Sequence, residues 1–188
     1  MKSQAAPVAE EAGVPEVIAA VEQSLPRQAD ALARARAFAE PLIAHEALDT
    51  GENTLAHADA VAAILKRMGG SEAMQAAAYL VYACPHLAKP EEVIAKAFGE
   101  SYAALAVETN KLVAVQRQAN AGTAPKAQAE NIRKMLLAFS RDLRVVMLRL
   151  ASRLQTLRWH AASRTPVPPL VARESLEVFA PLANRLGI

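Results

Sequence analysis

Apolar residues recur three and four positions apart along most of this chain, and the clearest run lies between residues 129 and 160. This spacing predicts two amphipathic helices. Asp142 separates them and is a suitable N-cap for the second, because its carboxylate can accept a backbone N–H. We expect both helices to bury their apolar faces. The apolar positions are Ile132, Met135, Leu136, Phe139, Leu143, Val146, Met147, Leu150, Leu154 and Leu157.

The same periodicity predicts further helices, separated by glycine and proline. Residues 71–83 are apolar nearly all round, so we expect this helix at the centre of the core. No segment shows the alternation of a convincing strand. The fold class is therefore expected to be an all-α bundle of about eight to nine helices, with residues 1–28 as a flexible leader and short helix, and 29–188 as the folded domain. The other predicted helices are 15–24, 28–45, 54–68, 90–99, 101–115 and 171–184.

Composition excludes several classes of function. The formal net charge is +2, so we expect no direct DNA binding through bulk electrostatics. The single cysteine, Cys84, rules out an internal disulfide framework and a cysteine-rich metal site. No apolar run is long enough to span a membrane, and no signal peptide is evident. A soluble cytoplasmic protein without membrane association is expected.

Local charge and candidate chemistry give weaker signals. Seven Arg and Lys residues face one acid between residues 131 and 158, a surface that could bind phosphate or nucleic acid. We favour a solvated helix face, because few aromatic side chains interleave as stacking platforms. The four histidines lack metal-motif spacing. Tyr82, Cys84 and His86 could form a small polar pocket at a helix end, although a plain helix terminus is the favoured interpretation.

Longer motifs resemble a known family. Residues 129–158 and 173–188, which include NIRKMLLA and FAPLANRLG, resemble the RelA/SpoT family of stringent-response enzymes, and residues 57–83 and 91–112 continue the match in order. The resemblance covers roughly residues 30–188 and implies the HD-type domain that removes pyrophosphate from (p)ppGpp. In that family a first His, a His-Asp pair and a later Asp hold a manganese ion.

The resemblance places most of these ligands on residues of a different kind. His57 matches the first His, whereas Val81 and Tyr82 stand at the His-Asp pair and Ser152 stands at the later Asp. Val81 cannot bind a metal ion, and Tyr82 and Ser152 are neutral, weak donors. We therefore expect a degenerate metal site and no cofactor.

The remaining functional positions also depart from the family pattern. Pro85 and His86 replace a Glu-Asp pair that assists the attack of water, and proline has no proton to transfer. Thr156 replaces an Asn that contacts nucleotide. Arg153 lies in the same motif, and it and Thr156 are candidates for vestigial nucleotide binding.

These departures predict a catalytically inactive pseudo-hydrolase, not an enzyme, from a monofunctional, RelA-type (p)ppGpp synthetase (GTP pyrophosphokinase). Its partner would be the synthetase domain of the same polypeptide, which is absent from this chain, and the parent protein would be ribosome-associated. The helix over 141–158 and the last helix are the expected contact surface.

Two alternatives remain open. One is residual manganese-dependent ppGpp 3′-pyrophosphohydrolase activity, with a rearranged site of His57, His86 and Asp59. The other is a non-catalytic sensor that retains weak affinity for (p)ppGpp.

Overall fold

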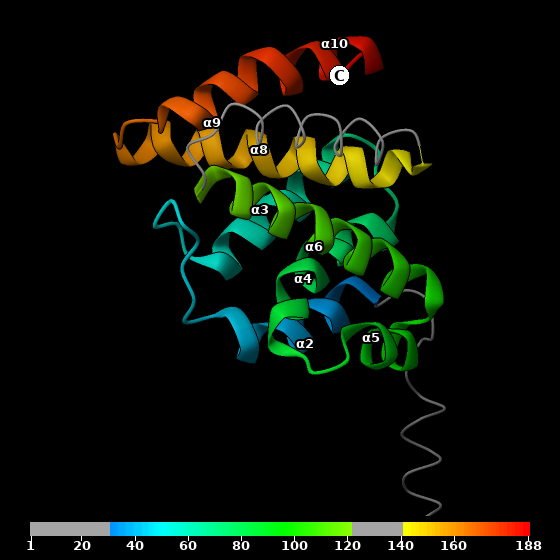
Figure 1. The fold of residues 1–188 in the computed structure, drawn as a ribbon. Helices are drawn as coiled ribbons and strands as arrows, with labels where there is room; N and C mark the ends of the chain where they lie inside the picture. Colours follow the sequence, from blue (N-terminus) through cyan, green and yellow to red (C-terminus); the bar gives the residue numbers. More distant parts are fainter. Residues whose placement is uncertain (1–30, 122–140) are drawn as a thin grey trace, which may run out of the picture. The chain divides into compact units, whose positions relative to one another are not determined.

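The computed structural model describes residues 31–121 and 141–188. The leader, the predicted helix over 15–24 and the first of the two cationic helices lie outside these residues. The described residues are helical and contain no β-strand, apart from one isolated bridge between Ala47 and Asn53. The predicted all-α fold class is confirmed (Figure 1).

The helices of the described residues follow the predicted periodicity. Their bounds are α2 (Ala31–Ile43), α3 (Thr54–Arg67), α4 (Glu72–Ala83), the 3₁₀ turn η1 (Cys84–His86), α5 (Pro90–Phe98), α6 (Glu100–Ala121), α8 (Leu143–Ser163), α9 (Pro169–Glu174), the π turn η2 (Ser175–Phe179) and α10 (Ala180–Leu186). Helix α6 begins before the predicted cap at Ser101 and continues past residue 115, because residues 116–121 are compatible with a helix.

Side-chain caps fix where three helices begin. The side-chain oxygens of Asn53 and Ser71 accept hydrogen bonds from backbone amides in the first turns of α3 and α4. Asp142 does the same for α8, where Oδ1 lies 2.9 Å from the amide nitrogen of Arg144. Each cap satisfies an amide that the helix itself leaves unpaired. The prediction for Asp142 is confirmed.

Helix α4 occupies the middle of the bundle and packs against α2, α3, α6 and α8 (Figure 1). Most of its side chains are buried, including Leu80, which has no exposed surface. A helix that is apolar all round can be stable only when neighbours cover every face. The expected central position of residues 71–83 is confirmed.

The C-terminal segment differs from the single helix predicted over 171–184. It is divided into α9, η2 and α10. Pro181 has no amide hydrogen and cannot donate to the carbonyl of Glu177, which removes one bond of a regular α-helix. The π turn immediately before Pro181 accommodates this missing donor.

Helix α8 also departs from expectation. Arg149 and Arg153 are each only 9% exposed, so the expected solvated cationic face is wrong for these two residues.

Among the described residues, no helix has the length and apolar character to cross a membrane.

The cap of α8 gives a stability prediction. Asp142→Ala should lower the free energy of unfolding by about 1 kcal/mol, because it removes an N-cap, whereas Asp142→Asn keeps a capping oxygen and should cost less. Urea unfolding at neutral pH measures both. The hydrogen bond from Arg144 lowers the pKa of Asp142. The stability that the ionised Asp142 carboxylate contributes is therefore fully present above the unfolded-state pKa. The Asp142→Ala deficit should therefore shrink as pH falls below about 4. An equal deficit for both variants would contradict the capping role.

Candidate functional site

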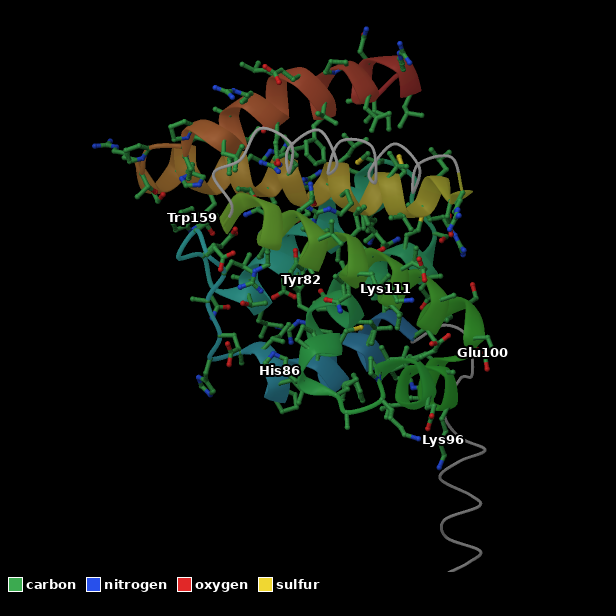
Figure 2. The ribbon with its side chains drawn as sticks, viewed as in Figure 1. Tyr82, His86, Lys96, Glu100, Lys111 and Trp159 are labelled. Carbon is green, nitrogen blue, oxygen red and sulfur yellow. The ribbon has the colours of Figure 1, made fainter. Side chains whose placement is uncertain are left out.

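A cavity of ≈ 350 Å³ opens between the loop before α3, the end of α4, α6 and α8. Its volume lies within the range of small-ligand sites. Tyr82 and His86, which Figure 2 labels at the end of α4 and in η1, both line it. The lining residues that matter most chemically are His57, Tyr82, His86, Arg149, Ser152 and Arg153.

A buried chain of hydrogen bonds forms one wall of this cavity. His57 is 1% exposed, and its Nδ1 lies 2.7 Å from Oε2 of Glu52 while its Nε2 lies 3.0 Å from Oγ of Ser152. Because a carboxylate only accepts hydrogen bonds, Nδ1 carries a proton and donates it to Glu52, while Nε2 is hydrogen-bonded to the Ser152 hydroxyl. The Tyr82 hydroxyl lies 3.2 Å from the same Ser152 oxygen. Burial raises the pKa of Tyr82, which keeps it neutral.

The loop before α3 holds Glu52 in place. The backbone amide of Leu48 donates to the backbone carbonyl of Glu52. The side-chain amide of Gln155 donates to the second carboxylate oxygen of Glu52, Oε1, at 2.6 Å. Gly51 has φ +91°, and a Cβ there would lie 3.6 Å from the ring of Trp159. Glu52 could not be identified from the sequence, because its role depends on contacts that this loop makes with α3 and α8.

The positions expected at a degenerate metal site do lie together, but they do not fit a manganese ion. Both ring nitrogens of His57 are already hydrogen-bonded. A second cavity of only ≈ 10 Å³, lined by Val81, Tyr82 and Ser152 among others, has room for about one water molecule. Within residues 31–121 and 141–188, no three His, Cys, Asp or Glu side chains are grouped so that they could hold a metal.

The rearranged metal site is not formed either. Asp59 accepts hydrogen bonds from Arg36 and from the Tyr79 hydroxyl, at 2.9 and 2.8 Å, and it does not line the cavity. The alternative set of His57, His86 and Asp59 is therefore wrong.

Pro85 and His86 both line the cavity. The segment is a helix terminus, as expected, and two of its residues, Tyr82 and His86, also share a cavity. Cys84, the third member of that cluster, is buried elsewhere in the core, where burial raises its pKa to about 11.

The two nucleotide-binding candidates on α8 are held by the protein itself. Arg153 donates to Glu174 at 2.6 Å and to the carbonyl of Val171 at 3.2 Å, and its guanidinium lies 4.6 Å from the ring centroid of Phe179. It joins α8 to α9 and η2. The Thr156 hydroxyl donates to the carbonyl of Ser152 at 3.1 Å, although Thr156 also lines the cavity.

Arg149 is a candidate that sequence reasoning missed. It lines the cavity, and its guanidinium donates to the side-chain oxygen of Gln116. Burial lowers its pKa to about 10, so it is charged at neutral pH. Its spacing of three residues from Ser152, on one helix face, was the available signal.

Comparison with known proteins identifies relatives of this chain. A family model described as "HD domain" matches residues 35–188. A Synechocystis protein named "Probable guanosine-3′,5′-bis(diphosphate) 3′-pyrophosphohydrolase" is 40% identical over 84% of this chain and 20% of its own length. The "Bifunctional (p)ppGpp synthase/hydrolase SpoT" of Escherichia coli K12 is 34% identical over 74% of this chain and 19% of its own. A "GTP pyrophosphokinase" of Myxococcus xanthus is 34% identical over 74% and 18%.

These relatives correct the functional prediction. Proteins 31–40% identical to this chain are named as 3′-pyrophosphohydrolases, which contradicts an inactive pseudo-hydrolase, a purely regulatory role and the prediction that the chain is not an enzyme. The prediction of no cofactor is contradicted as well, because hydrolases of the matching HD family are metal-dependent. Each of these predictions inferred a loss of function from the loss of metal-ligand residues. The chain spans about a fifth of the length of these relatives.

The Arg153–Glu174 pair gives a second stability prediction. Arg153→Met should lower the free energy of unfolding by about 3–5 kcal/mol, because it leaves the buried carboxylate of Glu174 without its partner. The double variant Arg153→Met/Glu174→Leu should recover much of this loss. Urea unfolding of the two single variants and the double variant measures the coupling. Additive losses would show that the pair is not coupled.

Proposed function

Because this chain belongs to the RelA/SpoT family through its HD domain, we propose that its cavity binds guanosine 3′,5′-bis(diphosphate) and cleaves the 3′-diphosphate. The observation that carries this proposal is the cavity of ≈ 350 Å³ whose wall combines the His57–Ser152 chain with buried arginines. Relatives of the same domain are named for this reaction.

The charges of the cavity suit a nucleotide that bears two diphosphates. Arg149 lies in its wall and forms no ion pair among the described residues, whereas Arg153 is paired with Glu174 at 2.6 Å and Arg117 with Asp49 at 2.9 Å. Guanidinium groups in a partly dehydrated site bind phosphate oxygens more strongly than they do in water. A polyanionic ligand would therefore be favoured over a neutral one of similar size.

The chain also supplies a group that can accept a proton. Glu52 fixes the ring of His57 so that Nε2 faces Ser152 in the cavity wall, and in the neutral tautomer with the proton on Nδ1 this nitrogen can accept a proton. A nucleophilic water beside Ser152 attacks the phosphorus attached to the 3′-oxygen and passes one proton to Nε2. The bond between that phosphorus and the 3′-oxygen breaks, and the proton is returned to the 3′-oxygen. The hydrolysed nucleotide would leave as GDP together with pyrophosphate.

The setting of this activity is part of the proposal. The relatives are about five times as long as the matched region, which supports a domain that works beside others, including a synthetase domain in the same polypeptide. Leu176, on the C-terminal segment, is 74% exposed and suits an apolar contact with such a domain. A cytoplasmic location and ribosome association of the parent protein remain predictions.

Hydrolysis is tested directly with the purified chain and ppGpp, with and without added manganese, by measuring GDP and pyrophosphate. We expect both products in equal amounts. His57→Gln should reduce the rate by about 100-fold or more, because it removes the proton acceptor.

His45→Gln is the matched control, since His45 is exposed and does not line the cavity. Its rate should equal that of the unmodified chain. Circular dichroism establishes that His57→Gln is folded. Absence of products under every condition, from protein shown to be folded, would refute the proposed hydrolase activity.

A further inference from the structure

The Arg149 guanidinium is a buried cation that forms no ion pair with an acidic side chain in the part of the chain that the structure describes. Its Nη2 donates to Gln116, whereas its Nε is buried and forms no hydrogen bond. Among residues 31–117 and 141–188, no carboxylate forms an ion pair with it. Gln116 is neutral and cannot balance its charge. The other arginine buried on α8, Arg153, is paired with Glu174.

The buried carboxylates near the cavity are engaged elsewhere. Glu174 attracts Arg149 electrostatically, but its hydrogen bond goes to Arg153 at 2.6 Å. Arg153 in turn repels Arg149. Glu52 accepts from both His57 and Gln155. Glu174 therefore forms its ion pair with Arg153 and not with Arg149.

Such an arrangement is unfavourable unless an anion completes it. Removing a charge from water costs free energy, and proteins normally offset this with a paired group of opposite sign. Arg149 differs from a wholly enclosed charge because it lines the cavity of ≈ 350 Å³. A ligand in that cavity would therefore lie beside the Arg149 side chain.

We propose that Arg149 is the anion-recognition residue of the cavity and that it binds a diphosphate group. Which nucleotide carries that group rests on the proposed function. A diphosphate presents several oxygens in the geometry that the guanidinium fork can bind in pairs. Ser152 lies one helical turn further along α8, so a group bound at Arg149 would lie beside the His57–Ser152 pair.

Isothermal titration calorimetry of the full chain with inorganic pyrophosphate, ppGpp and GDP tests this role. Arg149→Met should weaken the binding of pyrophosphate and of ppGpp by roughly tenfold to a hundredfold, the range for losing a hydrogen bond to a charged group. Arg158→Met is the matched control. Arg158 is an exposed arginine of the same helix outside the cavity lining, and its loss should leave both affinities within about threefold.

Thermal unfolding distinguishes recognition from a structural role. Without ligand, Arg149→Met should melt at the same temperature as the unmodified chain or higher, because it removes a buried charge that lacks a counter-charge. The rise in melting temperature that pyrophosphate causes should be lost in this variant. Arg149→Lys, which keeps a charge without the planar fork, should bind with intermediate affinity.

Unchanged pyrophosphate binding in Arg149→Met would overturn the inference, as would a fall in melting temperature as large as that of Arg153→Met. The two proposals can fail separately. Binding of pyrophosphate and ppGpp that depends on Arg149, without cleavage of ppGpp, supports this inference and refutes the hydrolase. Cleavage of ppGpp, with unchanged affinity in Arg149→Met, supports the hydrolase and refutes this inference.

Discussion

The hydrogen-bonded chain from Glu52 through His57 to Ser152 is the constraint around which the site is built. Burying a polar group in a helical core costs free energy unless the group has a hydrogen-bond partner. This requirement positions the loop before α3 against α8, since Glu52 is bonded to His57 on one side and to Gln155 on the other. The same contacts form one wall of the cavity. Stability and the candidate site thus depend on the same residues.

The arginines of α8 show how one sequence pattern can serve two purposes. Arg153 is paired with Glu174 and covers Phe179, so it contributes to the packing of the C-terminal segment. Arg149 has a neutral partner and faces the cavity. Four residues apart on one helix, they are equally buried but differ in the charge that surrounds them. That difference, and not burial alone, separates a structural cation from a candidate ligand-binding one.

Local features of the fold could be predicted from the sequence, and long-range features of the site could not. The start of α8 at Asp142 and the central position of α4 follow from caps and periodicity, which depend on near neighbours in the chain. The bond between His57 and Ser152 joins residues 95 positions apart, and no spacing rule anticipates it. The burial of Arg149 was missed for the same reason. The resemblance located Val81, Tyr82 and Ser152, but the conclusion drawn from them, an inactive domain, is contradicted by the relatives.

The central claim is that a guanosine bis(diphosphate) occupies the cavity between His57 and Arg149. A crystal structure of the chain with ppGpp, or with its hydrolysis products, tests this most directly. We expect the nucleotide in the cavity, with a diphosphate on the Arg149 guanidinium and phosphate oxygens within reach of the His57–Ser152 pair. An empty cavity at saturating nucleotide, or a nucleotide bound on another surface, would contradict the account.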